Sequence, residues 1–206
     1  MEQRPRELLH PLWIRLCHWV HGISIVMLIL TGLQIRFPDV FVIFPNLKRA
    51  VSLHNFFGFV VLFTFFAWFA YYAAKRTLVK QYVPSKDEII LGMPFYANYY
   101  FIRYFLGDPH PFEPTPEVKF NPLQKTTYFG IMFIMVPLQV ITGLLLWDIK
   151  TFRPIIEAVG GVRVVDALHI ILAYVFCAFL LVHLYLATLG HTFFSHFKAM
   201  IVGYED

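Results

Sequence analysis

Two histidines lie in one long apolar stretch of the sequence, and their spacing puts them on one side of a helix. His169 and His183 are 14 residues apart in a run from Asp166 to Gly190 that has no acid, lysine or arginine between its ends. In an α-helix, this spacing rises roughly 21 Å and leaves the two side chains about 40° apart around the axis. Histidine is the usual axial ligand of haem iron and a frequent ligand of other metals. Two metal-binding side chains are therefore predicted on one helix face, one near each side of a membrane.

Two further histidines lie near the starts of other apolar runs. His18 lies near the start of the first run, at the predicted depth of His183. His54 lies near the start of the second run, at the predicted depth of His169. Two bis-histidine sites at different depths predict an electron path across the bilayer, as two b-type haems provide. His21, one turn from His18, is an alternative ligand in its place. Its other predicted role is a hydrogen bond to a haem propionate or to a quinone.

A small residue follows each of these four histidines by one helical turn. A porphyrin lying against a helix requires such a residue, because a larger side chain would collide with the ring. The residues at this offset are Gly22, Gly58, Ala173 and Ala187. Two ligands per site do not complete a zinc tetrahedron, so haem is the favoured metal group. No CxxCH motif occurs, which argues against covalently attached haem.

The composition predicts an integral membrane protein. The chain has 206 residues, of which 58% are hydrophobic and 18% aromatic, and its mean hydropathy is +0.62. A soluble domain does not bury that much apolar surface. The formal net charge of +4 comes without a run of basic residues. It therefore indicates lysines and arginines at membrane interfaces and argues against a nucleic-acid partner.

Four apolar runs are long enough to cross a bilayer, which predicts an all-α, integral membrane four-helix bundle. We expect spanning helices at about 12–35, 51–74, 126–147 and 166–190, in a single membrane domain of residues 1–206 without internal repeats. Pro137 predicts a kink in the third helix, where Gln139 and Thr142 are predicted to make interhelical hydrogen bonds. The aromatic segment 95–106 is expected to be either an amphipathic helix at the interface or an ordinary packed loop helix.

Lysines and arginines are more numerous on one side of the predicted spans. Eleven of them lie in residues 1–15, in residues 75–125 and in the C-terminal tail, and six lie on the opposite side. The positive-inside rule then places both termini in the cytoplasm. The expected location is the bacterial cytoplasmic (inner) membrane.

Several segments resemble one family of respiratory membrane proteins. They are RLCHWVHG, LHNFFGF, the stretch from KFNPLQK to GLLLW, ALHIILAYVFCAFLLVHLYLA and the tail KAMIVGYE. Together they resemble the dihaem cytochrome b subunit of respiratory membrane oxidoreductases. Members of that group are the formate dehydrogenase gamma subunit, the b-type cytochrome of nickel-iron hydrogenases and the thiosulfate reductase cytochrome b. The resemblance covers essentially the whole chain.

The resemblance implies two non-covalent b haems, with axial ligands His18, His54, His169 and His183. It also implies a quinone, menaquinone or ubiquinone, beside the cytoplasmic haem. The family residue that binds the quinone head group corresponds to Asn121, and Gln124 is a polar neighbour. Helix capping is the alternative role for both residues. Arg15, one turn before His18, is expected either to pair with a haem propionate or to anchor the helix at the interface.

The expected function is that of a membrane-anchoring electron-transfer subunit with no catalytic residues of its own. An iron–sulfur or multihaem subunit outside the cytoplasm would exchange electrons with the haem at His54 and His169. Quinone would exchange them with the haem at His18 and His183. A separate catalytic subunit would act on the primary substrate. The complex of these subunits could also form a higher oligomer. The alternatives are a stand-alone dihaem superoxide:quinone oxidoreductase and, from a different class, a haem-free transporter or scaffold.

Overall fold

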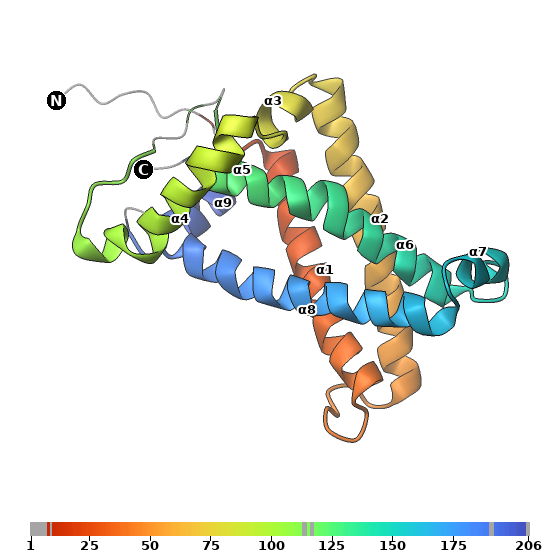
Figure 1. The fold of residues 1–206 in the computed structure, drawn as a ribbon. Coiled ribbons are helices and arrows are strands. Elements are labelled where there is room, and N and C mark those ends of the chain that lie inside the picture. The colour runs from red at the N-terminus through yellow and green to blue at the C-terminus, as the bar shows by residue number, and fades with distance from the viewer. Residues whose placement is uncertain (1–7, 9, 113–114, 116–117, 190–191, 205–206) are drawn as a thin grey trace. The chain divides into compact units, whose positions relative to one another are not determined.

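Helices make up the regular secondary structure of the residues that the structure describes, which are 8, 10–112, 115, 118–189 and 192–204. The structure is a computed structural model (Figure 1). Four helical segments are long and apolar enough to cross a membrane. They are Leu12–Arg36 (α1), Leu47–Ala74 (α2), Pro122–Trp147 and Val162–Ala187 (α8). The predicted all-α membrane class is therefore confirmed.

The chain forms two units that interleave along the sequence. Unit 1 consists of Met1–Leu16, Phe69–Phe133 and Leu180–Asp206. Unit 2 consists of Cys17–Trp68 and Ile134–Phe179. Unit 2 thus contains the larger parts of α1, α2 and α8. Unit 1 contains the long connection between the second and third spans.

Three of the four spans begin four residues before the predicted start. Asn46 precedes α2, and its side-chain oxygen accepts a hydrogen bond from the backbone N–H of Arg49 at 2.8 Å. Asn121 caps the third span in the same way. An asparagine cap satisfies backbone N–H groups that have no partner within the helix. The sequence prediction placed these starts too late because an apolar run marks the part of a helix in hydrocarbon and not its capped end.

Two glycines set the start of α8. Gly160 and Gly161 have φ angles of 105° and 93°, in the left-handed region that side chains other than glycine avoid. They end the short helix Arg153–Ala158 (α7) and allow α8 to begin at Val162. α8 ends at Ala187, before the predicted end at Gly190, since Thr188 and Leu189 are not helical; Gly190 itself lies outside the described residues.

Buried Gln34 holds the connection between α1 and α2, which lie side by side (Figure 1). Its side-chain oxygen accepts hydrogen bonds from the backbone N–H groups of Ile43 at 3.0 Å and Phe44 at 2.7 Å. Its amide nitrogen donates to the Phe44 carbonyl at 3.1 Å. Fixing this loop to the end of α1 limits how far α2 can slide along α1.

The third span changes helix type in front of Pro137. It consists of Pro122–Phe129 (α5), the π-helical segment Gly130–Met135 (η3) and Val136–Trp147 (α6). Proline lacks a backbone N–H and its ring clashes with the carbonyl four residues earlier. A π-helical segment widens the turn in which that conflict arises. This change of hydrogen-bond pattern was not predicted from the sequence, and the kink predicted at Pro137 stays a prediction.

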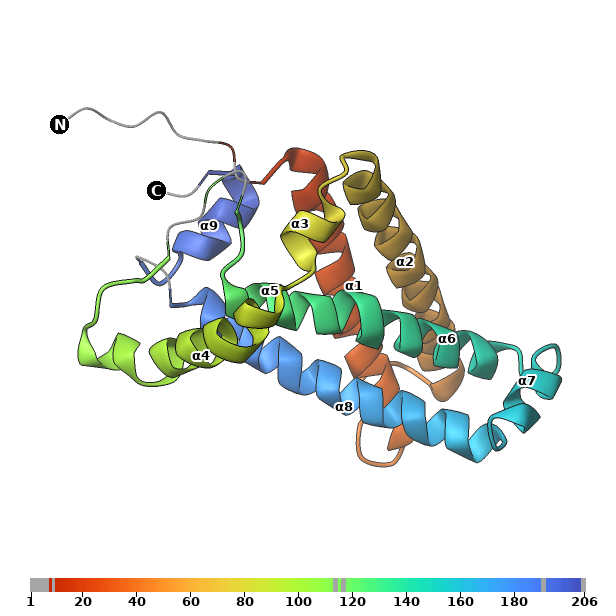
Figure 2. The same cartoon turned by 45° about the horizontal axis from the view of Figure 1, so that its top comes forward.

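The connection between α2 and α5 is helical and packs on α5. It contains Leu78–Tyr82 (α3), the π-helical turn Glu88–Gly92 (η1), Met93–Phe101 (α4) and the 3₁₀ turn Arg103–Leu106 (η2). Both η1 and α4 pack against α5 (Figure 2). α4 buries Tyr99 and Tyr100 together with Leu189, and it exposes Phe95 and Phe101. The buried tyrosines fit the expectation of an ordinary packed loop helix. The exposed phenylalanines would also suit a helix at the membrane interface, so that alternative stays a prediction.

The two ends of the described chain meet in unit 1. Ser195–Val202 forms a helix (α9) that the sequence did not predict. After it, the Gly203 carbonyl accepts a hydrogen bond from the backbone N–H of His10 at 3.1 Å. Gly203 has a φ of 97°, so glycine suits this left-handed position at the end of α9.

Gly92→Ala is expected to lower the free energy of unfolding by about 1–3 kcal/mol, as overpacking in a close contact does. A Cβ at Gly92 would lie 2.6 Å from the Pro122 Cβ, so η1 and α5 would have to separate. Thermal unfolding in detergent measures this effect. Gly130→Ala is the control, because a Cβ there meets nothing within 4 Å in the described part of the chain. Equal stability of the two variants would contradict the close packing of η1 on α5.

Candidate haem-binding site

Two of the predicted ligands lie close together within unit 2. The imidazole of His54 on α2 and that of His169 on α8 have ring centroids 6.2 Å apart, with 66° between their planes. A metal–imidazole bond of about 2 Å, with about 1.1 Å more from nitrogen to ring centre, puts two rings on opposite sides of one iron about 6 Å apart. The spacing therefore fits a bis-histidine metal group, although the role of the two residues as axial ligands stays a prediction.

The His54 ring is oriented by a threonine on α1. Thr31 is fully buried, and its hydroxyl donates to the Met27 carbonyl at 2.7 Å. The hydroxyl has one hydrogen, so its oxygen accepts from His54 Nδ1–H, which lies 2.9 Å away. Neutral imidazole carries one N–H, and the other nitrogen keeps a lone pair. Nε2 of His54 is therefore the nitrogen available to a metal.

The His169 ring is oriented by two residues on α6. The Thr142 hydroxyl donates to the Leu138 carbonyl at 2.8 Å, and its oxygen accepts from His169 Nδ1–H at 2.9 Å. The Gln139 amide nitrogen lies 3.2 Å from His169 Nε2, to which it donates a hydrogen bond. Both contacts indicate that Nε2 carries the lone pair. The interhelical hydrogen bonds predicted for Gln139 and Thr142 are confirmed.

One polar atom beside His169 has no partner. The side-chain oxygen of Gln139 is buried and accepts no hydrogen bond among the residues that the structure describes. A buried polar atom without a partner costs about 1–3 kcal/mol. An unpartnered atom at this place is compatible with a bound group, and by itself it does not distinguish this site, since Gln81 Oε1 and Thr126 Oγ1 are also without a partner in the described part of the chain.

The predicted small residues beside the ligands face open space. A Cβ built at Gly22 or Gly58 would meet no heavy atom within 4 Å in the described part of the chain. These glycines follow His18 and His54 by one turn. Room at these positions, two imidazoles at metal-binding separation and an unsatisfied amide oxygen together fit a haem.

His18 and His183 belong to different units. His18 is half-buried on α1 in unit 2, and His183 is half-buried on α8 in unit 1. Their pairing as ligands of a second haem stays a prediction from the sequence. Arg15, in unit 1, donates from Nη1 to the Ile201 carbonyl of α9. Its Nε is buried and has no partner among the described residues, so the propionate contact predicted for Arg15 also stays a prediction.

His21 is held in the same way as the ring of His54. Its Nδ1 lies 2.8 Å from the hydroxyl oxygen of buried Thr64 on α2, and that hydroxyl donates to the Val60 carbonyl at 2.9 Å. This contact and the Thr31–His54 contact are ten residues apart along α1 and also ten residues apart along α2. Equal spacing on both helices is what antiparallel packing of α1 and α2 requires. The fixed Nδ1–H of His21 leaves Nε2 as an acceptor, which suits ligation of a metal, so the ligand role stays a prediction. A hydrogen bond to a propionate or to a quinone carbonyl, both of which only accept, would require the protonated ring.

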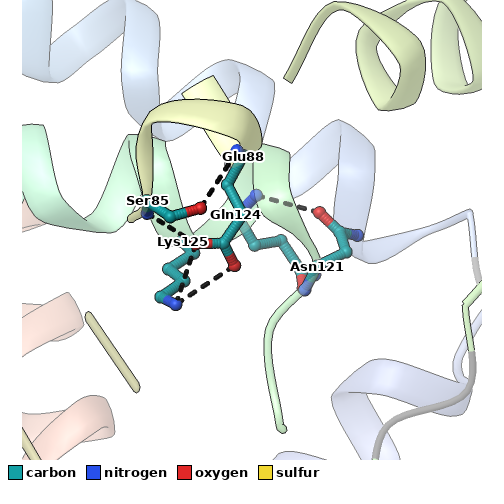
Figure 3. A network of polar contacts seen from close by, with 5 residues as sticks. All are labelled: Ser85, Glu88, Asn121, Gln124 and Lys125. Carbon is teal, nitrogen blue, oxygen red and sulfur yellow. Dashed lines mark hydrogen bonds and ion pairs between the residues drawn. The ribbon is translucent and has the colours of Figure 1, made fainter. Parts of the chain in front are cut away.

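The predicted quinone residues take part in a polar network in unit 1 (Figure 3). The side-chain oxygen of Asn121 accepts from the Gln124 backbone N–H at 3.0 Å, and the Gln124 side-chain oxygen accepts from the Asn121 backbone N–H at 3.1 Å. This reciprocal pair is a capping box at the start of α5. The capping alternative therefore describes the contacts that both side chains make, and quinone contact stays a prediction.

Asn121 also connects α5 with α4. Its amide nitrogen donates to the Tyr100 hydroxyl at 3.0 Å, and that hydroxyl lies 3.0 Å from His110 Nε2. His110 Nδ1 lies 2.7 Å from the Phe112 carbonyl, which can only accept, and 3.3 Å from the Phe112 backbone N–H, which can only donate. The shorter contact favours the tautomer in which Nδ1 carries the hydrogen and Tyr100 donates to His110 Nε2. Asn121 is 1% and Tyr100 5% exposed, and burial raises the pKa of the tyrosine. This buried chain of hydrogen bonds was not predicted, because its members are far apart in the sequence.

An ion pair joins η1 to α5 in the same unit. Lys125 Nζ lies 3.1 Å from both side-chain oxygens of Glu88, and the Ser85 backbone N–H donates to that carboxylate at 2.6 Å (Figure 3). Burial alone would raise the pKa of Glu88. Hydrogen bonds from Ser85 and Lys125 outweigh burial, and the pKa lies below the ordinary value of 4.5.

Comparison with known proteins agrees with a haem site. Residues 9–203 match the sequence profile of a family described as Prokaryotic cytochrome b561. The chain is also similar to a curated protein of Escherichia coli (strain K12) named "Putative cytochrome YdhU". The two are 32% identical over 197 residues, which cover 93% of this chain and 72% of that protein.

Gly58→Leu is expected to abolish haem binding at His54 while leaving the fold intact. The leucine side chain would enter the space that a Cβ at this position finds open, and so would compete with a porphyrin. Haem per chain in the purified variant measures the effect. Gly58→Ala is the control, because alanine occurs at the same offset from His169 and His183. A Gly58→Leu variant with the wild-type haem content would show that no porphyrin lies against this face of α2.

Glu88→Gln is expected to lower the free energy of unfolding at neutral pH by about 1 kcal/mol. Because the pKa of Glu88 is lowered in the folded chain, the ion pair contributes fully above the ordinary pKa. That contribution is lost as the pH falls through the lowered value. Thermal unfolding as a function of pH should therefore show the difference between wild type and Glu88→Gln shrinking in acid.

Glu157→Gln is the matched control for Glu88→Gln. It breaks the pair of Arg153 with Glu157, whose side chains are 76% and 62% exposed, and its effect should be much smaller. An effect of Glu88→Gln that does not change with pH would contradict a role for the charge.

Proposed function

The chain belongs to the prokaryotic cytochrome b561 family, and from this membership we propose that it is the dihaem, membrane-anchoring subunit of a respiratory oxidoreductase. The family implies a membrane b-type cytochrome that binds haem b and transfers electrons. The proposed subunit passes electrons between an iron–sulfur or multihaem partner outside the cytoplasm and the quinone pool. The observation that carries the proposal is the imidazole pair His54 and His169, whose Nε2 lone pairs are fixed by buried threonines.

Haem b supplies reversible one-electron transfer at its iron when it is bound. The residues of the chain bind and orient the group and keep it in an apolar surrounding. His54 and His169 hold the first haem. Thr31, Thr142 and the loop contact of Gln34 fix the helices and rings that present them.

The second haem is proposed at His18 and His183. The 14-residue spacing of His169 and His183 puts both on one face of α8, and Ala187 and Gly22 supply small residues one turn from the ligands. Two haems at different depths support electron transfer across the membrane. His21, held by Thr64, is the alternative to His18.

The proposed quinone site lies near the cytoplasmic haem, at the start of α5. Asn121 is buried there, and Gln124, Lys125 and Glu88 surround the same helix start. In this proposal, N–H groups of Asn121, Gln124 or Lys125 donate hydrogen bonds to the carbonyl oxygens of the quinone head group. The argument for quinone rests on the family resemblance, and the network supports it by placing exchangeable protons at this helix start.

The proposed orientation has both termini in the cytoplasm of a bacterial inner membrane. Four apolar helices and the family fit a multi-pass protein of that membrane. The excess of lysine and arginine on the terminal side supports this orientation. Two of the residues counted on that side, Arg4 and Arg6, lie outside the described residues.

The test is a haem count on the purified protein with single histidine variants. Wild type is expected to bind two haem b per chain and to give reducible b-type Soret and alpha bands. His54→Ala and His169→Ala should each remove the haem that faces the partner. His183→Ala should remove the other haem and quinone reactivity, leaving the first reducible by the partner.

The variants of the first helix decide between the two candidate ligands. His18→Ala is expected to lose one haem and His21→Ala to keep both. The reverse result would make His21 the ligand. A wild-type protein without haem would overturn the function, and a pure homomer that oxidises superoxide would replace the partnered subunit by the stand-alone alternative. A stoichiometric iron–sulfur or multihaem protein that co-purifies with the chain supports the partnered reading.

A further inference from the structure

A Thr-Gly dipeptide lies beside the ring of His54 and another lies beside the ring of His169. The Thr31 hydroxyl on α1 lies 2.9 Å from His54 Nδ1. The next residue, Gly32, faces the same ring, and a Cβ added there would lie 3.6 Å from His54 Cε1. Thr142 and Gly143 on α6 face the His169 ring at the same two ring atoms. Each Thr-Gly pair lies on the first helix of a hairpin, and each histidine lies on the second.

Each threonine hydroxyl uses its hydrogen within its own helix and faces an imidazole with its oxygen. Both threonine side chains are buried, with 0% and 4% exposure, and each donates its only hydroxyl hydrogen to a carbonyl four residues earlier. The oxygen can then only accept, and it faces an imidazole N–H. The glycine beside it allows the ring edge to approach the helix closely. A Cβ at Gly143 would lie 3.3 Å from His169 Cε1, closer than side chains usually pack.

We propose that Thr31 and Thr142 are positioning residues that set the tautomer and rotation of the two axial histidines and thereby the electron affinity of the haem between them. This inference rests on the proposed haem at His54 and His169. It adds that threonines on α1 and α6 set the redox equilibrium of this haem, although neither helix supplies a ligand to it.

The expected direction follows from the hydrogen bond. An acceptor on Nδ1–H increases the basicity of Nε2, which stabilises the oxidised iron that it ligates. Removing the acceptor therefore favours the reduced haem. Thr31→Val and Thr142→Val keep the branched shape of threonine and remove the oxygen.

The test is a redox titration of the variants, followed by absorption spectroscopy. Each valine variant should make this haem about tenfold more reduced at a fixed ambient potential, which for a one-electron couple is a shift of about 59 mV upwards. Thr31→Ser and Thr142→Ser should restore the wild-type potential. Thr64→Val is the matched control. Thr64 accepts a hydrogen bond from His21 and lies ten residues from His54 along α2, so this substitution should leave the potential of this haem unchanged.

A second measurement separates ring rotation from the hydrogen bond. Gly143→Ala should change the electron paramagnetic resonance spectrum of the oxidised haem, since its Cβ would push the His169 ring. Gly32→Ala should change it less, because a Cβ there makes an ordinary contact with His54.

The outcomes distinguish the inference from the proposed function. Unchanged potentials in both valine variants, or serine variants that shift as far as the valine variants, overturn the positioning role. Loss of haem in a valine variant with retention in the serine variant supports it. A wild-type chain without haem instead overturns the proposed function itself.

Discussion

The structure depends on the rule that a polar group inside an apolar helix must find its partner within the protein. Three histidines obey it in one way: each Nδ1–H donates to a threonine whose own hydrogen is given to the preceding turn. Because the partner always lies on another helix, each bond fixes both the ring and the spacing of two helices. The same contacts that satisfy the imidazoles thus leave each Nε2 as the nitrogen with a lone pair, as the proposed metal binding requires.

Much of the fold was predictable because long apolar runs give a strong signal. α1 begins at the predicted residue, but α2 and α5 begin earlier, because Asn46 and Asn121 cap them outside the apolar run. The π-helical segment before Pro137 was not predictable, since proline conflicts can be relieved in several ways. α9 was missed because a short helix near a chain end has no distinct apolar pattern.

The proximity of His54 and His169 was predictable from the sequence, whereas the residues that surround them were not. His54 and His169 were paired from depth alone, and Thr142 and Gln139 were expected to bond between helices. Thr31 was missed, although the dipeptide Thr-Gly recurs at 31 and 142 and could have indicated it. The Glu88–Lys125 pair and the Asn121–Tyr100 contact join residues distant in the sequence, and no local pattern indicates them. Asn121 also shows that one side chain can satisfy a helix end and a neighbouring helix at once.

Gln139 has a consequence for the haem proposed at His54 and His169. The Nε2 lone pair of His169 accommodates one partner, so the amide of Gln139 and an iron atom would exclude each other. With the proposed haem bound, the Gln139 side chain would have to leave His169 and find other partners for its amide. A residue on a helix that supplies no proposed ligand would in this way change its rotamer with the occupancy of the site.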